Sequence, residues 1–552
     1  MLYNKTMRNT FRSLVLILAT TFISNFGYSQ NNGFEVIRSL EIMNEIYENL
    51  EKYYVDDLKS GSMSKAAIDA MLKDLDPYTV YYHETDIEDY QLMTTGQYGG
   101  IGALIRKVDD YSYITEPYEG KPAQVAGLRA GDKIIAIDGK DMKDKPSSEV
   151  STALKGPKGK ELEVEIERPD GEKKKFTFNR DEIKLPDVPY SGLMENNVGY
   201  IKLNSFTRTA HQEVLAAYTD LKAEGMEKLI LDLRGNGGGL LIEAVKIVNM
   251  FVPKNEVVVT TKARVAEENR RYTTMSAPTD LDIPVVVLIN EGSASASEIV
   301  AGSLQDYDRA VIVGTTSFGK GLVQRTYDLS YGSKMKLTIA KYYTPSGRCV
   351  QRLEYYDRVD GDRPEEVPDS LIQIFHTTNG REVIDGRGVE PDAAVEPGEF
   401  SRLTAVLFGQ NFVFDFATEY YYRNLGNTPK EDFDLPESDY EAFKQYVLER
   451  EFTYSTASEE RLKKMKETAE AEGFYEDMKD EYEALLNKVV PSKERDLEKF
   501  KDEIIQLLEN EIVSRYHYQN GRAVHAFKDD VFMQRAMEIF KSSDEYNTIL
   551  GN

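Results

Sequence analysis

The spacing of apolar positions changes character along the chain. Residues about 33–95 carry apolar side chains at helical spacing, as in the stripe of Val36, Leu40, Met43 and Ile46. Residues about 97–180 alternate apolar and polar positions over short runs separated by Gly and Asp turn residues, which predicts strands. The run at 161–167 alternates strictly, so one of its faces should be buried and the other solvated.

A different pattern follows, in which buried strands and helices take turns. Residues 228–233, 284–289 and 310–313 are apolar runs of strand length. A helix is predicted after the first of them, at 240–248, and another begins near Ser295. Repeated strand–helix alternation over about 183–395 is typical of a layered α/β domain.

The last part of the chain, about 396–552, is highly charged and has a helical pattern. Ile504, Leu508 and Ile512 lie on one helical stripe, and Pro491 separates two predicted helices. The charged positions fall on the other faces, which is typical of solvated helices.

The first thirty residues have the pattern of an export signal. Basic residues within the first twelve positions precede the apolar run 14–23, and Gly27 and Ser29 follow it at the spacing of a cleavage site. The run is short against the roughly 20 residues of a membrane span. A cleaved signal peptide at 1–29 is therefore predicted, with an uncleaved N-terminal anchor as the alternative.

Composition narrows the function classes. The chain has 552 residues, 41% hydrophobic and 29% charged, which indicates several folded domains. Its net charge of −26 disfavours nucleic acid and anionic membrane surfaces as partners. The single cysteine, Cys349, excludes an internal disulfide framework and a zinc site made of several thiolates. Five scattered histidines make a histidine-rich metal site improbable.

Two glycine-rich segments imitate nucleotide-binding loops. Residues 314–320 match a phosphate loop, but Gly321 stands where a Ser or Thr must hold magnesium. Residues 235–239 follow a strand and open a helix, but Leu240 occupies the position of the last glycine in a dinucleotide loop. Neither segment therefore predicts a nucleotide.

The segment 292–298 is a stronger candidate for chemistry. Its small residues lie between a predicted strand and a predicted helix, where Ser295 would gain from the N-terminal N–H groups of the helix. A plain helix cap is the alternative. A serine nucleophile needs a base, and no histidine is near in sequence. Lys320 lies in an otherwise uncharged stretch at 311–324, so burial could make its amine neutral; an exposed loop lysine is the alternative.

These motifs together resemble the C-terminal processing peptidases, also called tail-specific proteases. The matching motifs are Ser-Ala-Ser-Ala-Ser-Glu-Ile at 293–299, Gln-Asp-Tyr at 305–307 and Phe-Gly-Lys-Gly-Leu-Val-Gln at 318–324. The resemblance covers about 35–395. It implies that Ser295 is the nucleophile and Lys320 its base, and that the amide of Gln324 orients the lysine amine.

The resemblance also gives the glycine loop a function. Asp-Leu-Arg-Gly-Asn-Gly-Gly-Gly at 232–239 matches a family motif whose backbone stabilises an oxyanion. The two N–H donors that it implies belong to Gly238 and Ala296. Gly237 stands where the family often has proline, so we expect a less rigid loop here.

The strand-rich part is similar to a PDZ domain. Gly100, Ile101 and Gly102 match the loop whose backbone N–H groups capture the C-terminal carboxylate of a peptide. The segment 76–79 matches the stretch that precedes the PDZ domain in the family. Residues about 352–385 are longer than the usual family pattern.

The expected architecture is an α/β and α+β multidomain chain with a crotonase-like α/β protease core. Its predicted parts are a signal peptide at 1–29, a helical N-terminal segment at 30–96, an inserted PDZ domain at 97–180, a Ser/Lys protease core at 181–396 and a helical C-terminal region at 397–552. The last of these could instead serve assembly rather than the enzyme.

The expected function is that of an exported serine endopeptidase that recognises C-terminal tails. Its partners would be proteins or peptides with apolar C-termini, without metal, cofactor or nucleic acid. The expected location is the periplasm or cell envelope of a Gram-negative-type bacterium, with secretion, a homo-oligomer and an adaptor protein left open. The alternative is a non-catalytic PDZ-based binding or scaffold protein with a peptidase-like core.

Overall fold

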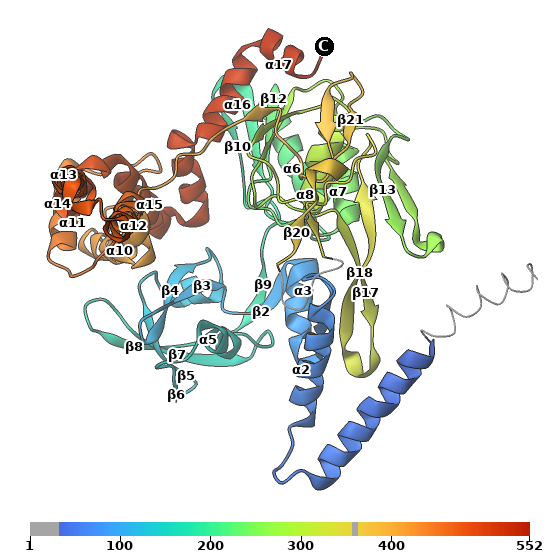
Figure 1. Cartoon of the computed structure of the whole chain (residues 1–552), viewed down its shortest axis with the longest axis horizontal. Helices are drawn as coiled ribbons and strands as arrows, with labels where there is room; N and C mark the ends of the chain where they lie inside the picture. The colour runs from blue at the N-terminus through green and yellow to red at the C-terminus, as the bar shows by residue number, and fades with distance from the viewer. Residues whose placement is uncertain (1–32, 356–362) are drawn as a thin grey trace, which may run out of the picture. The chain divides into compact units, whose positions relative to one another are not determined.

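A computed structural model describes residues 33–355 and 363–552 (Figure 1). The described residues belong to two units that divide between Asp74 and Leu75. The predicted signal peptide at 1–29 lies outside the described residues. Within the described ranges, no helix combines the length and the apolar character needed to cross a membrane.

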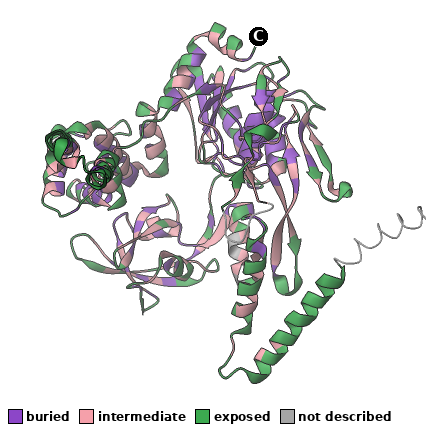
Figure 2. Ribbon diagram, viewed as in Figure 1, coloured by how far each residue is buried: buried purple, intermediate pink, exposed green. Residues whose placement is uncertain are grey.

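The first unit, from residue 33 onward, consists of two helices. One covers residues 33–53 and the other, α2, covers Ser60–Lys73. A hydrogen bond of 2.9 Å between the hydroxyl groups of Tyr47 and Ser64 joins them. The helical pattern predicted here is confirmed, and the side chains of the first helix are mostly exposed (Figure 2).

The α/β core of the second unit is built on a six-stranded sheet. Its order is β10 (Tyr190–Met194), β11 (Val198–Lys202), β12 (Lys228–Asp232), β15 (Val285–Ile289), β16 (Val311–Gly314) and β23 (Ala393–Ala394). The β10–β11 pair is antiparallel and the other pairs are parallel. The three apolar runs predicted as buried strands are therefore three consecutive interior strands of this sheet.

Helices cover both faces of the sheet. The helices α6 (Ala210–Ala223), α7 (Leu241–Val248) and α8 (Ala296–Asp306) share one core with alternate strand residues such as Leu231 and Val287. The opposite strand residues, such as Ile230 and Val286, pack against α16 (Val531–Lys541) and α17 (Ser543–Ile549). The helices at the end of the chain thus cover the second face of the sheet. Figure 2 shows that buried residues are concentrated around this sheet.

A second sheet stands beside the first and corrects one prediction. It contains β1 (Val80–Tyr82), β13 (Val257–Ala263), β14 (Arg270–Thr273), β17 (Leu322–Asp328) and β18 (Lys334–Tyr343). The prediction of helix throughout 33–95 is wrong at β1, which pairs antiparallel with β18. Its Val-Tyr-Tyr sequence favours a strand, and its partner lies some 250 residues away, beyond the reach of a local pattern. The helix α3 (Ile87–Thr95) follows.

The strand-rich part has its own apolar core. One sheet contains β3 (Ala103–Val108), β4 (Tyr111–Pro117), β5 (Lys133–Ile137), β6 (Lys140–Asp141), β7 (Glu161–Glu167) and β8 (Lys173–Asn179), and a second pairs β2 (Gln97–Gly100) with β9 (Asp181–Lys184). The helices are α4 (Pro122–Ala126) and α5 (Ser147–Leu154). Leu162, Val164 and Ile166 of β7 are buried, as its strict alternation predicted.

The remaining elements are short strands after β18 and a run of helices. The strands are β19 (Leu353–Glu354), β20 (Glu365–Glu366), β21 (Ile374–His376) and β22 (Glu382–Ile384). The helices are α9 (Arg402–Gly409), α10 (Phe412–Arg423), α11 (Glu437–Leu448), α12 (Ala457–Glu472), α13 (Lys479–Val489), α14 (Lys493–Lys499) and α15 (Lys501–Ala526). Residues of α9, α10, α11, α14 and α15 share one core, and α15 is interrupted at Tyr518.

Candidate active site

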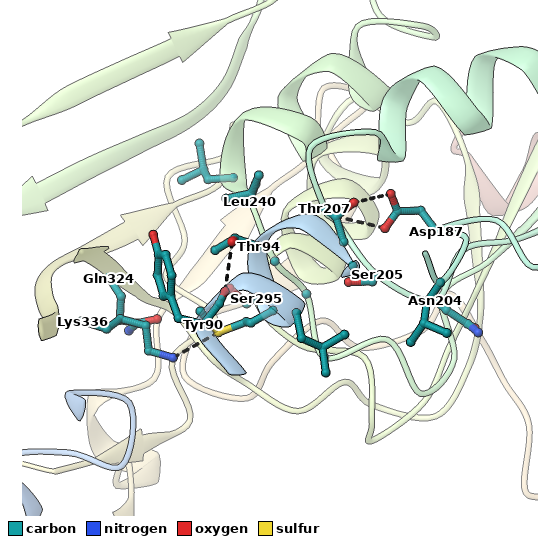
Figure 3. A pocket seen from close by; sticks show the side chains of 18 of the residues that line it. Tyr90, Thr94, Asp187, Asn204, Ser205, Thr207, Leu240, Ser295, Gln324 and Lys336 are labelled. Atoms are coloured by element: carbon teal, nitrogen blue, oxygen red, sulfur yellow. Dashed lines mark hydrogen bonds between the residues drawn. The ribbon is translucent and has the colours of Figure 1, made fainter. Parts of the chain in front are cut away.

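Most of the residues predicted to carry the chemistry line one cavity of about 810 Å³ (Figure 3). Its lining includes Ser295 at the start of α8, Gly238 from the loop after β12, Lys320 just before β17 and Gln324 within β17. The helix α3 and the strand β18 contribute further side chains. Residues separated by more than eighty positions in the chain therefore meet around one space.

Ser295 occupies a strained turn between β15 and α8. Its φ and ψ angles are 56° and −109°, a backbone conformation that costs a non-glycine residue roughly 1–3 kcal/mol. The surrounding contacts hold it there. Its N–H donates to Glu298 Oε2 at 2.8 Å, and its carbonyl accepts from the Tyr342 hydroxyl at 3.2 Å. A serine on such a strand-to-helix turn presents its hydroxyl to the cavity, as nucleophile elbows do.

A buried carboxylate links the serine to the lysine. Glu298 Oε2 accepts hydrogen bonds from the backbone N–H groups of Ser295 and Lys320, both at 2.8 Å. Its Oε1 accepts from Gly319 N–H at 2.7 Å and from the Ser317 hydroxyl at 2.5 Å. Burial raises the pKa of Glu298, and these four donors oppose that rise. The sequence motif contained Glu298, but its role follows only from the fold.

Lys320 is half-buried, so the exposed-loop alternative is wrong. Burial and, to a smaller extent, the positive charge of Lys336 lower the pKa of its amine to about 8, although Glu298 and Asp76 act in the opposite direction. Its amine lies 4.1 Å from the centre of the Tyr78 ring. In the part of the chain that the structure describes, this amine forms no ion pair. It is therefore a lysine that can exist in the neutral form near physiological pH.

Gln324 is held by a short relay of polar groups. Its Nε2 donates to Thr338 Oγ1 at 3.1 Å, and Thr338 Oγ1 donates to Asp76 Oδ1 at the same distance. Asp76 also accepts from Tyr78 N–H at 2.8 Å, which places Tyr78 under Lys320. Because the amide nitrogen binds Thr338, direct orientation of the lysine amine by Gln324 stays a prediction.

The glycine loop lies directly against the serine turn. A Cβ atom at Gly238 would stand 2.7 Å from the carbonyl oxygen of Ala294 and 2.9 Å from Ser295 Cβ, and its φ is +97°. Only glycine therefore allows this approach. The buried Asn236 joins both sides, because its own carbonyl accepts from Ala294 N–H at 3.0 Å and from the Ser297 hydroxyl at 2.8 Å.

The two predicted oxyanion donors differ in their present partners. The N–H of Gly238 donates to Asn236 Oδ1 at 2.9 Å. The N–H of Ala296 donates no hydrogen bond within the described ranges, as expected at the first position of α8. The role of Gly238 stays a prediction, and it requires that its N–H exchange the Asn236 side chain for the substrate oxygen.

The start of the glycine loop is fixed by a buried ion-pair network. Asp232 accepts from Arg234, Lys202 and the Tyr200 hydroxyl, and Arg234 also binds Asp530 at the N-terminus of α16. Burial would raise the pKa of Asp232, but the Arg234 and Lys202 cations outweigh burial and lower it to about 2. The loop is therefore tied to the C-terminal helices.

The residues predicted to bind a peptide carboxylate lie outside this cavity. Gly100 ends β2, Ile101 is buried in the core of the strand-rich part, and Gly102 has a φ of +70°. Among the described residues, the N–H groups of Ile101 and Gly102 donate no hydrogen bond. In the same ranges, no three His, Cys, Asp or Glu side chains are placed to hold a metal ion.

Three family models match the chain. The model of peptidase family S41 matches residues 197–359, a PDZ domain model matches 113–168, and a model described as "Probable PDZ-protease, C-terminal helical domain" matches 403–540. The expected arrangement of a mixed α/β core, a PDZ domain and a C-terminal helical domain is thereby confirmed.

Curated relatives agree with these models. A probable CtpA-like serine protease of Staphylococcus saprophyticus is 32% identical over 61% of this chain and 68% of its own length. One from Staphylococcus aureus is 36% identical over 56% of this chain and 62% of its own length. The matches place the chain among the PDZ-containing serine peptidases. It belongs to peptidase family S41, and its curated relatives are CtpA-like serine proteases.

Solved structures similar to the chain include a photosystem II D1 C-terminal processing protease. It is 27% identical, with a TM-score of 0.35, and the match covers 64% of this chain and 87% of that one. The PDZ domain of a carboxy-terminal protease from Vibrio cholerae, solved with a peptide, is 31% identical, with a TM-score of 0.16, over 16% of this chain and 99% of that one.

Proposed function

We propose that this peptidase is an exported endopeptidase whose PDZ domain captures the apolar C-terminal tail of a protein and whose Ser295 and Lys320 cut the chain upstream. The observation that carries the proposal is the buried Glu298 carboxylate, which binds the backbone N–H of both residues. That bridge supports a fixed geometry for the pair, and fixed geometry is what a nucleophile and its base require.

The first half of the reaction forms an acyl-enzyme. The neutral amine of Lys320 takes the hydroxyl proton of Ser295 as the serine oxygen attacks the substrate carbonyl. The oxyanion of the tetrahedral intermediate accepts hydrogen bonds from the N–H groups of Ala296 and Gly238. The intermediate then collapses, the C–N bond breaks, and the Lys320 ammonium gives its proton to the departing amine.

The second half returns the enzyme to its starting state. Water attacks the ester carbonyl while neutral Lys320 accepts a proton from it. The second tetrahedral intermediate collapses, the bond to the serine oxygen breaks, and the lysine ammonium returns the proton to Ser295. One water is consumed, and the new chain end leaves as a carboxylate. No step draws on a metal or an organic cofactor.

The PDZ domain supplies substrate selection in this proposal. PDZ domains bind peptide C-termini by backbone N–H contacts to the carboxylate and by strand addition. The free N–H groups of Ile101 and Gly102 support such a contact here. An apolar tail would leave the aqueous phase on binding, and the chain upstream of it would then enter the cavity that holds Ser295.

Digestion of an unfolded protein with an apolar C-terminal tail tests the proposal. Fragments are identified by mass spectrometry for the full chain and for Ser295→Ala and Lys320→Ala, which should each abolish cutting without lowering the melting temperature. The exposed residues Ser276 and Lys254 provide matched controls as alanine variants. An amidated tail should slow cutting by the unaltered chain.

Three results would decide against parts of the proposal. Full cutting by either active-site variant would refute the Ser/Lys assignment. Binding of the tail without any cutting by the unaltered chain would favour the non-catalytic binding protein. Equal cutting of free and amidated tails would remove the PDZ-based selection.

Export is the remaining part of the proposal. It is supported by the charge and hydropathy pattern of residues 1–29, which lie outside the described residues. N-terminal sequencing of the protein from the envelope fraction of expressing cells should show a start at or near Gln30. An intact N-terminus on a membrane-bound protein would instead indicate the uncleaved anchor.

A further inference from the structure

A second lysine shares the cavity of Ser295 and Lys320. Lys336 lies on β18, where it pairs with Thr326 of β17, and Thr338, two positions later, pairs with Gln324. Residues two apart on a strand project from the same face, so Lys336 and Thr338 point to the same side of the β17–β18 pair. Figure 3 shows Lys336 beside Gln324, at the edge of the space that Ser295 also borders.

The charge of Lys336 has no carboxylate partner in the described part of the chain. The polar contact of its amine is to Met93 Sδ at 3.6 Å, and a thioether is a weak acceptor that carries no charge. The acid that acts on Lys336 is Asp76, whose carboxylate already accepts from Tyr78 N–H, from Thr79 and from Thr338. Lys336 is therefore a half-buried cation held in the cavity without an ion pair.

We propose that Lys336 is a positioning residue for the reaction, whose positive charge keeps the Lys320 amine in the neutral form that accepts the serine proton. This inference rests on the proposed role of Lys320 as base. Two ammonium groups facing one partly desolvated cavity repel each other, so protonation of the second costs more free energy than protonation of the first.

Burial lowers the pKa of both amines, and Asp76 opposes that fall at each of them. Lys320 is the member that loses its proton, because its pKa falls to about 8. The pKa of Lys320 is lowered first by burial and then by Lys336. The acids that face Lys320 are Glu298 and Asp76, and the phenol of Tyr78 stays neutral because burial raises its pKa far above the usual range.

The other charged side chains of the cavity have polar partners of their own. Arg325 of β17 binds Glu268 at 2.5 Å. Asp187 accepts hydrogen bonds from Thr207 and Thr209. Lys336 is thus the cation that acts on the dyad lysine.

The test compares pH profiles of the full chain with those of Lys336→Met and Lys336→Arg. The measured quantities are the rate constant for labelling by a fluorophosphonate, which reports attack by Ser295, and kcat/KM for peptide cleavage. A neighbouring like charge shifts a pKa by on the order of one unit. The methionine variant should therefore move the acidic limb of the pH–rate profile about one pH unit upward. This shift makes labelling about tenfold slower near pH 7. At high pH the variant should reach the original rate.

The arginine variant keeps the charge and cannot act as a base, so it should retain the original limb. Lys341→Met is the matched control. Lys341 lies five positions further along β18, is not part of the cavity lining, and binds Glu354 at 2.8 Å. Loss of the Lys341 charge should leave the acidic limb of the pH–rate profile in place. Melting temperatures of all variants show whether each is folded.

Two results would overturn the inference while leaving the Ser/Lys assignment intact. One is a methionine variant whose acidic limb lies at the same pH as that of the unaltered chain, whether or not its rates are lowered at every pH. The other is an arginine variant that shifts like the methionine variant or is inactive at every pH, because either result would mean that Lys336 acts by contact or as a base. Failure of the Ser/Lys assignment would give a different result, namely that the fluorophosphonate labels Lys320→Ala at the original rate.

Discussion

The helix α16 should stabilise the catalytic sheet, and Ile539→Ala tests this directly. Ile539 is fully buried and shares a core with strand residues such as Ile230, Val286 and Leu288. Truncating a buried Ile to Ala typically costs about 2–5 kcal/mol, because apolar contacts are lost and a cavity remains. With roughly 2–4 °C per kcal/mol for a domain of this size, a cost near 3 kcal/mol lowers the melting temperature by about 6–12 °C.

Calorimetry and active-site labelling together identify the unfolding domain. A multidomain chain can show several transitions, so the calorimetric trace is aligned with the temperature at which Ser295 ceases to react with a fluorophosphonate. Both should fall together in Ile539→Ala. Gln534→Ala, on the exposed face of the same helix, should change neither by more than about 1–2 °C.

The outcome also decides between two roles for the C-terminal region. If α16 belongs to the enzyme core, the variant loses active sites at lower temperature without any change in molecular mass by light scattering. An unchanged labelling transition, with or without altered mass, would refute the packing argument. That result would favour a role in assembly alone for the C-terminal region.

Three further changes probe the site. Activity of the unaltered chain should rise with pH through about 8, because Lys320 is a base only above its pKa; a profile of kcat/KM that is flat from pH 6 to 10 would contradict this. Gly238→Ala should abolish cleavage, since its Cβ would stand 2.7 Å from a backbone oxygen, whereas Gly237→Ala, with open space around its Cβ, should remain active; equal rates would refute the loop geometry. Glu298→Gln should slow labelling at least a hundredfold, because hydrogen bonds to a charged acceptor contribute about 1.5–3 kcal/mol each; a loss under threefold would remove the bridge.

Local patterns were enough for the strands and turns that carry the predicted pair. The apolar runs around 228–233 and 284–289 are central strands, and Ser295 does cap α8. A continuous apolar run identifies these strands, because they have partners on both faces and every position is therefore apolar. The sequence pattern did not predict the strand β1, because three residues are too few to show a period and its partner strand, β18, is distant in sequence.

The contacts that hold the site were beyond the sequence for a similar reason. Glu298 and Asn236 both stood inside quoted motifs, yet nothing in a motif says which backbone N–H groups a side chain will meet. Lys336 carried no motif at all. Its position in the cavity follows from the register of β17 on β18, and register depends on pairing that no single strand encodes.

A common principle connects these missed residues. Asp76, Asn236 and Glu298 each use a buried side chain to accept backbone N–H groups from the segments that border the cavity. Such acceptors satisfy donors that would otherwise be buried without partners, so each segment is fixed by its main chain whatever its side chains do. The positions of Ser295 and Lys320 are then set through their main chains, which is what the proposed reaction requires of a nucleophile and its base. Substitutions at the three acceptors should therefore lower the rate of acylation by displacing these groups. Removing the charge of Glu298 or Asp76 should also move the pH dependence to lower pH, because both acids raise the pKa of Lys320, whereas loss of the Lys336 charge should move it to higher pH.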